Sequence, residues 1–144
     1  MIRQRLGKDL LFFDGGMGTL LQEKGLAPGE LPETWNLTHS EEIYKIHRQY
    51  IEAGSDIILT NTFGANALKF HDDSCSLEEI IKAAVSHVKK AEREALLQTG
   101  DERKIYTALD VGPTGKLLKP MGDLEFETAY EAFKLSLIHI SEPT

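Results

Sequence analysis

Three apolar stretches alternate with amphipathic stretches along this chain, and no other feature constrains the fold as strongly. The apolar stretches are residues 10–13, 56–60 and 104–109. Each has the length of a strand, and the short apolar run 10–13 is expected to form a buried one. The second is apolar throughout its centre, as is typical of a strand that is covered on both faces. Strands that alternate with helices form parallel sheets with right-handed crossovers, so the expected fold class is α/β.

The amphipathic stretches carry recognisable helix ends. A short helical turn is expected over residues 19–23, followed by two longer helices that begin at capping-box spacings and end at glycines. A fourth helix is expected to start near Asp123, with Phe126, Tyr130 and Phe133 on one face. The markers of the two longer helices are Thr38-His39-Ser40-Glu41 with Gly54, and Ser76-Leu77-Glu78-Glu79 with Gly100.

Composition excludes several classes of protein. The 144 residues carry a net charge of −7, and no basic block interleaves with aromatic residues, so nucleic acid is not an expected partner. No apolar run approaches the roughly 20 residues of a membrane span. Cys75 is the single cysteine, which excludes an internal disulfide framework and fits a reducing compartment. We therefore expect a cytoplasmic protein with no membrane partner.

Each predicted strand runs directly into glycine or polar residues, and these are the candidate site. Glycine and polar residues after any one strand are typical of an ordinary turn, but the carboxyl ends of parallel strands meet at one edge of a sheet, so three such loops favour a binding site. A carboxylate beside glycine N–H groups suits a small molecule that carries both an amine and an anion. The residues are Asp14, Gly15 and Gly16, then Asn61, Thr62 and Phe63, and then Asp110.

Other candidate motifs are weaker. Gly16-Met17-Gly18 begins a dinucleotide fingerprint, but Leu21 stands where the third glycine is needed. Residues 110–117 resemble a phosphate-binding loop, but this motif requires a glycine in place of Asp110 and a hydroxyl residue in place of Leu117. His47 is expected to pack on an apolar helix face, Trp35 to anchor a loop, and Cys75 to have no functional role.

Taken together, several motifs resemble the homocysteine S-methyltransferase family, and most closely the amino-terminal homocysteine-binding module of cobalamin-dependent methionine synthases. The resemblance covers residues 6–134. Its motifs are Asp14-Gly15-Gly16-Met17-Gly18-Thr19, Pro32-Glu33-Thr34-Trp35-Asn36-Leu37, Ile46-His47 with Tyr50 and Ala53-Gly54, Thr60-Asn61-Thr62-Phe63-Gly64-Ala65-Asn66 and Asp110-Val111-Gly112-Pro113-Thr114-Gly115.

The resemblance implies a (β/α)₈ TIM barrel that transfers a methyl group to the thiolate of zinc-bound homocysteine and so makes methionine. By position, Asp14 binds the substrate ammonium, and the Gly15 and Gly16 amides bind its carboxylate. Asn61, Thr62, Phe63 and Asp110 line the same mouth. Cobalamin and methyltetrahydrofolate are implied for domains further along the chain, while betaine and S-methylmethionine stay open as methyl donors.

The chain departs from the family in three ways. The family's zinc is held by three cysteines late in the barrel, and Cys75 matches none of them, so no metal ligand is expected here. A complete barrel needs about 250 residues, and only three strand–helix units are present. We therefore expect residues 1–134 to be a partial homocysteine-binding domain, inactive alone and prone to aggregate. Residues 135–144 resemble translated sequencing-adapter sequence and are expected to be a non-native tail.

Two alternatives stay open. The first is another barrel enzyme that acts on a small carboxylate, with a general base among Asp14, His47 and Asp110. The second is a non-catalytic α/β binding module that folds alone or as a homodimer.

Overall fold

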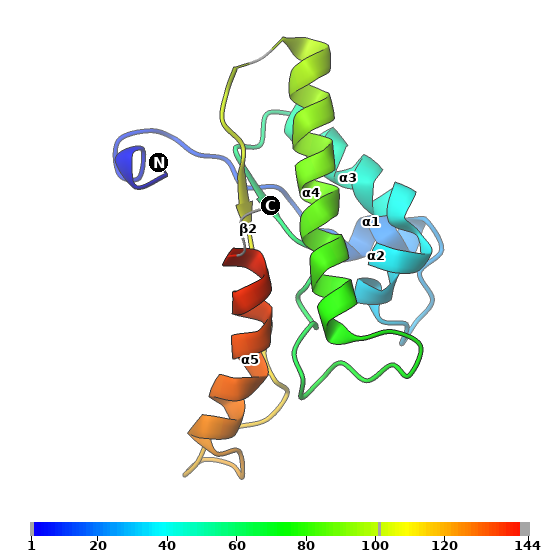
Figure 1. The fold of residues 1–144 in the computed structure, drawn as a ribbon, viewed down its shortest axis with the longest axis vertical. Coiled ribbons are helices and arrows are strands. Elements are labelled where there is room, and N and C mark those ends of the chain that lie inside the picture. Colours follow the sequence, from blue (N-terminus) through cyan, green and yellow to red (C-terminus); the bar gives the residue numbers. More distant parts are fainter. Residues whose placement is uncertain (1, 101, 142–144) are drawn as a thin grey trace.

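The computed structural model describes residues 2–100 and 102–141, and it shows an α/β arrangement (Figure 1). Its short 3₁₀ elements are η1 (Ile2–Gln4) and η2 (Pro32–Thr34). Its helices and strands, in chain order, are α1 (Gly18–Glu23), α2 (Trp35–Thr38), α3 (Ser40–Glu52), β1 (Ile57–Leu59), α4 (Leu77–Thr99), β2 (Tyr106–Ala108) and α5 (Phe126–Ser141).

Strands β1 and β2 pair in parallel and are joined by α4, as the alternation of strands and helices predicts. Ile57 lies opposite Tyr106, and Leu59 lies opposite Ala108. Both strands fall inside the predicted segments 56–60 and 104–109. The parallel α/β class is therefore confirmed in this part of the chain.

The first predicted strand forms less completely than expected. Phe13 makes only an isolated parallel bridge with Ile57, and the Phe12 carbonyl accepts the N–H groups of Asp56 and Ile57. Phe12 and Phe13 are 55% and 59% exposed, so the expectation that residues 10–13 form a buried strand is wrong. The reason is that no second layer of the described residues packs over this segment, which leaves its apolar side chains in contact with solvent.

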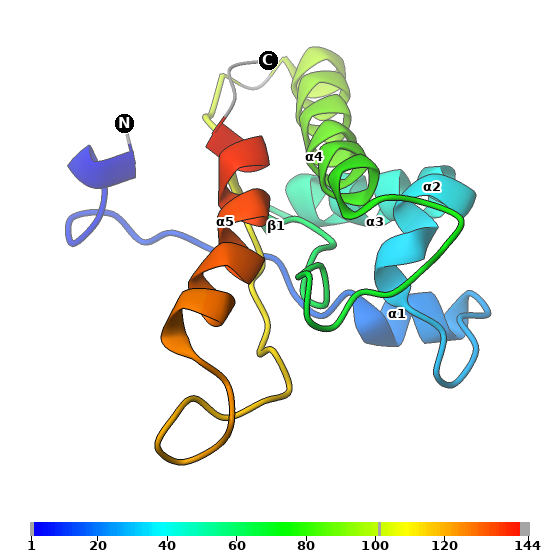
Figure 2. The ribbon, with the colours of Figure 1, turned by 60° about the horizontal axis from the view of Figure 1, so that its bottom comes forward.

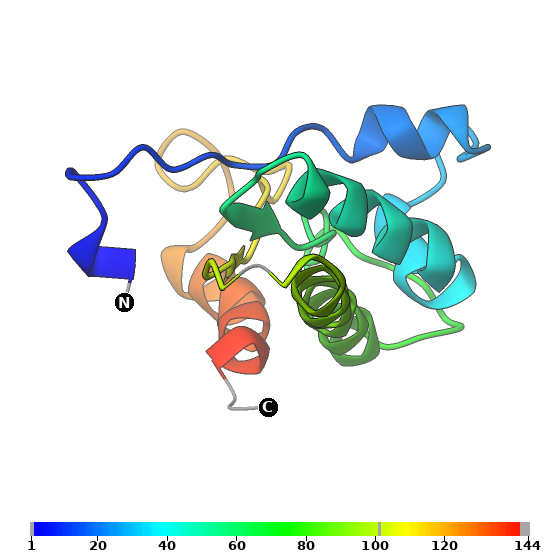
Figure 3. The same ribbon diagram turned by 90° about the horizontal axis from the view of Figure 1, so that it is seen from above.

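The main core lies between the strand pair and the helices α3 and α4, which run side by side (Figures 1 and 2). Viewed from above, α3 and α4 lie to one side of the strands and η1 lies on the other (Figure 3). Ile58 is fully buried against the helices. The cluster consists of Tyr44, Ile51, Ile58, Val88, Ala91, Ala95 and Ile105.

The helix ends agree with the sequence in part. Ser76 and Glu79 form both bonds of a capping box, and α4 ends at Gly100 in the left-handed conformation. Helix α3 begins at Ser40 as predicted, but Thr38 does not cap it, because Thr38 belongs to α2 and its hydroxyl donates to the carbonyl of Thr34. Helix α5 begins at Phe126 rather than near residue 123. No helix of the described residues is both long enough and apolar enough to cross a membrane.

Candidate functional site

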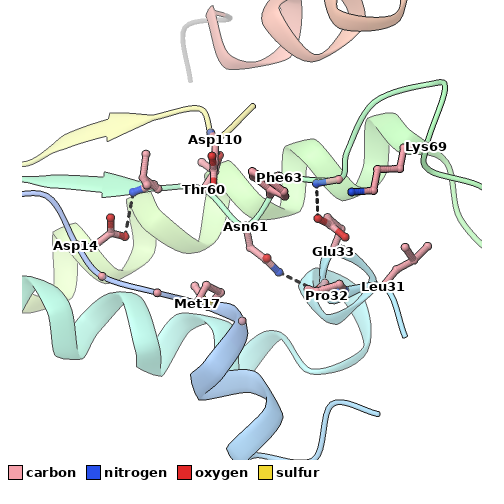
Figure 4. A pocket seen from close by; sticks show the side chains of 15 residues that line it. Asp14, Met17, Leu31, Pro32, Glu33, Thr60, Asn61, Phe63, Lys69 and Asp110 are labelled. Atoms are coloured by element: carbon pink, nitrogen blue, oxygen red, sulfur yellow. Dashed lines mark hydrogen bonds between the residues drawn. The ribbon is translucent and has the colours of Figure 1, made fainter. Parts of the chain in front are cut away.

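A cavity of about 610 Å³ opens where the first segment and β1 end (Figure 4). The loop after residue 13, the loop after β1, η2 and Asp110 form its walls. Six of the seven residues singled out from the sequence line it. They are Asp14, Gly15, Gly16, Asn61, Phe63 and Asp110.

Thr62 does not line this cavity and instead supports the loop from behind. Its side chain is buried, and its hydroxyl donates to the Asp110 carbonyl at 2.9 Å. The Thr60 and Thr62 hydroxyls lie 2.7 Å apart, and the Asp110 N–H donates to the Thr60 hydroxyl. These bonds join the loop after β1 to the loop after β2.

The carboxylate of Asp14 lines the cavity, and one of its two oxygens already accepts a hydrogen bond. Oδ2 accepts the Leu59 N–H at 3.0 Å, whereas Oδ1 is buried without a partner among the described residues. Burial raises the pKa of Asp14 from 3.8 to about 6, and the nearby charge of Asp110 adds to the rise. The free oxygen is therefore a ready acceptor for a cationic or N–H donor group.

Gly15 and Gly16 bring backbone amides to the cavity wall. No hydrogen bond among the described residues uses either N–H group, so both donors are available to a ligand. Tyr50 Oη donates to the Gly16 carbonyl at 3.1 Å. A Cβ atom on Gly15 would lie 2.7 Å from Tyr50 Oη, so only glycine fits this position without a shift of the tyrosine.

Asn61 is held by a buried amide network. Its Nδ2 donates to the Pro32 carbonyl at 2.8 Å and to Asn36 Oδ1 at 3.2 Å. Asn36 Nδ2 donates in return to the Asn61 carbonyl at 2.8 Å. The Asn61 side chain is thus largely occupied in fixing its own loop.

Phe63 and Asp110 form the part of the wall nearest β2. The Gly112 N–H donates to the Phe63 carbonyl at 3.0 Å, and a Cβ atom on Gly112 would lie 2.3 Å from that oxygen. Partial burial raises the pKa of Asp110. Lys69 Nζ lies 5.4 Å from the centre of the Phe63 ring, which leaves the ammonium at the cavity rim.

Glu33 lines the cavity but is not among the site residues expected from the sequence, although it belongs to the Pro-Glu-Thr-Trp motif. It is 3% exposed, and its Oε1 accepts the Gly64 N–H. Its Oε2 is buried without a partner among the described residues. A glutamate in a Pro-Glu-Thr turn is locally typical of a surface residue, so only the contact with a loop about thirty residues away reveals its position.

The weaker candidates lie elsewhere. His47 is fully buried and away from the cavity, and burial lowers its pKa from 6.5 to about 3, with His87 contributing. Trp35 anchors its loop as predicted, through an Nε1–H bond to Glu30 and stacking on His39. Cys75 is a free thiol outside this cavity.

The zinc site that the family resemblance implies does not fit the described residues. Although Asp14, Glu33 and Asp110 all line the cavity, no group of three or more histidine, cysteine or acidic side chains in the described part of the chain is arranged to hold a metal ion. No chemical step is therefore assigned to a metal here.

An α/β unit with a ligand-sized cavity at the carboxyl ends of its parallel segments has the architecture of a domain that binds small molecules. A family model described as homocysteine S-methyltransferase matches residues 11–142. The chain belongs to the homocysteine S-methyltransferase family.

The relatives are matched over part of their length. A methionine synthase of Mycobacterium leprae (strain TN) is 30% identical over 141 residues, which cover 94% of this chain and 12% of that protein. The homocysteine methyltransferase MmuM from Escherichia coli, in its metallated form, has a TM-score of 0.80 at 20% identity and covers 96% of this chain and 52% of that one. The oxidized form of the same enzyme has a TM-score of 0.66 at 24% identity, and the match covers 79% of this chain and 41% of that one. The chain thus spans about half of the solved structure that it matches.

Proposed function

We propose that this chain is part of a methionine-synthase-type homocysteine S-methyltransferase and that its cavity binds the amino-acid portion of homocysteine. The unpartnered, buried Oδ1 of Asp14 beside the free amides of Gly15 and Gly16 carries this proposal. The substrate ammonium binds Asp14, and the two amides bind its carboxylate. Family membership and the similarity to a methionine synthase support this assignment.

In the reaction that we propose for the whole protein, the homocysteine sulfur attacks the methyl carbon of a donor. The new S–C bond forms as the bond between methyl group and donor breaks, and the thiol proton is lost. The described residues bind and orient the amino-acid portion of the substrate. They supply no group that binds the substrate sulfur. Methylcobalamin, betaine and S-methylmethionine are the methyl donors that the family resemblance leaves open.

The proposal extends to the organisation of the protein. Residues 1–134 would form the first three strand–helix units of a (β/α)₈ barrel, residues 135–144 a non-native tail, and the whole protein would be cytoplasmic. The genomic sequence downstream of the Lys134 codon tests the boundary. An open reading frame that continues into a fourth strand and later encodes a Gly-Gly-Cys-Cys stretch would support it, whereas a genomic frame that encodes residues 135–144 unchanged would refute the non-native tail.

Binding of L-homocysteine to the 144-residue chain, measured by isothermal titration calorimetry, tests the function directly. We expect binding by the wild-type chain, and weaker binding by Asp14→Asn because the amide loses the charge that attracts an ammonium. An analogue without the ammonium, 4-sulfanylbutanoate, should bind both proteins equally. Equal affinity of both proteins for homocysteine would contradict the assignment of Asp14.

A second candidate function rests on the raised pKa of Asp14. A carboxylate that titrates at about 6 is suited to act as a general base in a barrel enzyme that acts on a small carboxylate. Asp14→Asn in a full-length relative separates the two functions. Loss of homocysteine affinity supports substrate binding, while loss of turnover at unchanged affinity supports a base.

A further inference from the structure

Glu33 reaches the cavity from η2 and lines the same cavity as Asp14 (Figure 4). It is the most deeply buried of the three carboxylates that line the cavity, at 3% exposure. A carboxylate is rarely buried to this extent unless both oxygens are satisfied. The two oxygens of Glu33 have different surroundings.

The first oxygen holds a loop. Oε1 accepts the Gly64 N–H, and the fit is so close that a Cβ atom on Gly64 would lie 2.8 Å from Oε1. The neighbouring Pro32 carbonyl accepts Asn61 Nδ2 at 2.8 Å. Residues 32 and 33 therefore fix both ends of the cavity loop 61–64.

The second oxygen has no protein partner. Oε2 is buried, and no described residue donates to it, including Lys69 at the rim. Asp14, Glu33 and Asp110 give the lining three acidic groups, against the single ammonium of Lys69. An acceptor in such a lining is stabilised by a donor that arrives with the ligand, and most strongly by a cation.

We propose that Glu33 both positions the cavity loop through Oε1 and binds the ligand through Oε2, which accepts a hydrogen bond from a protonated amine. This proposal rests on the proposed function, because it assigns to the three N–H donors of the one ligand ammonium a second acidic contact besides Asp14. It predicts that the cavity favours small primary amines over otherwise similar anions.

The test uses the full chain with three probes: L-homocysteine, n-butylamine, which carries only the ammonium, and 4-sulfanylbutanoate, which lacks it. Calorimetry gives the affinities, and the Gly64 amide resonance reports on the loop. Glu33→Gln keeps an oxygen for the Gly64 N–H but removes the charge. Glu23→Gln, at an exposed position of α1 outside the cavity lining, is the matched control.

We expect Glu33→Gln to weaken binding of both amines by about tenfold or more, the loss expected for a charge-assisted hydrogen bond. Binding of 4-sulfanylbutanoate and the Gly64 resonance of the free protein should change little. Glu23→Gln should bind all probes like the wild-type chain. If Glu33→Gln does not fold, the ¹³Cδ resonance of Glu33 in the wild-type chain should still move when butylamine is added.

The outcomes separate the two proposals. If butylamine binds in a Glu33-dependent way and homocysteine does not bind, the proposed function fails and the role of Glu33 stands. If homocysteine binds equally to wild-type and Glu33→Gln, the role of Glu33 fails and the function stands. Failure of both amines to bind, or a ¹³Cδ resonance that does not move, overturns the role of Glu33.

Discussion

The Asp14 carboxylate accepts the Leu59 N–H at 3.0 Å, so the side chain that faces the cavity also ties the first segment to β1. The Asp14 N–H donates to the Ile57 carbonyl at the same distance of 3.0 Å. Ligand binding and pairing of the first segment therefore depend on one residue. This dependence gives the protein a specific response to pH.

Stability should fall with rising pH in a manner that depends on Asp14. Because the folded pKa of about 6 exceeds the ordinary 3.8, the stabilising contribution of Asp14 is complete below 3.8 and is lost as pH rises through about 6. We expect Asp14→Asn to gain in unfolding temperature relative to the wild-type chain between about pH 4 and about pH 7. Asp73→Asn, at an exposed position, is the control, and parallel curves for Asp14→Asn and wild type would contradict the prediction.

His47 should make the protein less stable as pH falls, which is the opposite of the effect of Asp14. Its folded pKa of about 3 lies below the ordinary 6.5, so its contribution to stability is present above 6.5 and is lost as pH falls towards 3. Neither ring nitrogen has a partner among the described residues, so His47→Leu should flatten the acid side of the curve of unfolding temperature against pH. The exposed His71→Gln variant should keep the wild-type curve, and an unchanged acid slope in His47→Leu would refute this account.

Gly112→Ala should destabilise both cavity loops. The added methyl group would lie 2.3 Å from the Phe63 carbonyl, a backbone atom that cannot rotate away, so we expect a loss of about 2 kcal/mol or more in the free energy of unfolding. Gly18→Ala, where a Cβ atom meets nothing within 4 Å, should change stability little. Urea unfolding of the two variants measures both values, and equal values would show that the Gly112 contact relaxes readily.

At concentrations above those of the binding and unfolding measurements, the isolated chain should self-associate through the exposed face of α5. Phe126 is 68% exposed and Leu137 54% exposed, and they help line an apolar groove of about 570 Å³. Light scattering after gel filtration should show aggregates that Phe126→Lys with Leu137→Lys reduces. Leu97→Lys, at a 77% exposed position outside the groove, should not reduce them. A wild-type chain that stays monomeric at the highest concentration measured would contradict this prediction.

Helix ends that depend only on residues within one turn could be predicted from the sequence. The capping box at Ser76 and the glycine end at Gly100 depend on residues within one turn, and the structure contains both. The predicted capping box at Thr38 does not form, because Thr38 belongs to the preceding helix α2 and its hydroxyl donates to the carbonyl of Thr34.

Contacts between distant segments explain the rest. The convergence of Asp14, Asn61 and Asp110 on one cavity followed from the parallel topology. The burial of Glu33 did not follow, because its partner Gly64 comes from another loop. The exposure of Phe13 could not be predicted either, because an apolar run in a sequence does not indicate which face of the strand lacks a packed layer.

The Thr60, Thr62 and Asp110 hydrogen bonds have a consequence for how the protein can be studied. They connect the cavity to the pairing of β1 with β2, so a molecule that binds only the assembled cavity shifts the population towards the paired strands. At a concentration one hundred times its dissociation constant, such a molecule stabilises the native state by about 2.7 kcal/mol. Heat resistance can thus serve as an assay for cavity ligands, and one that requires no catalytic turnover.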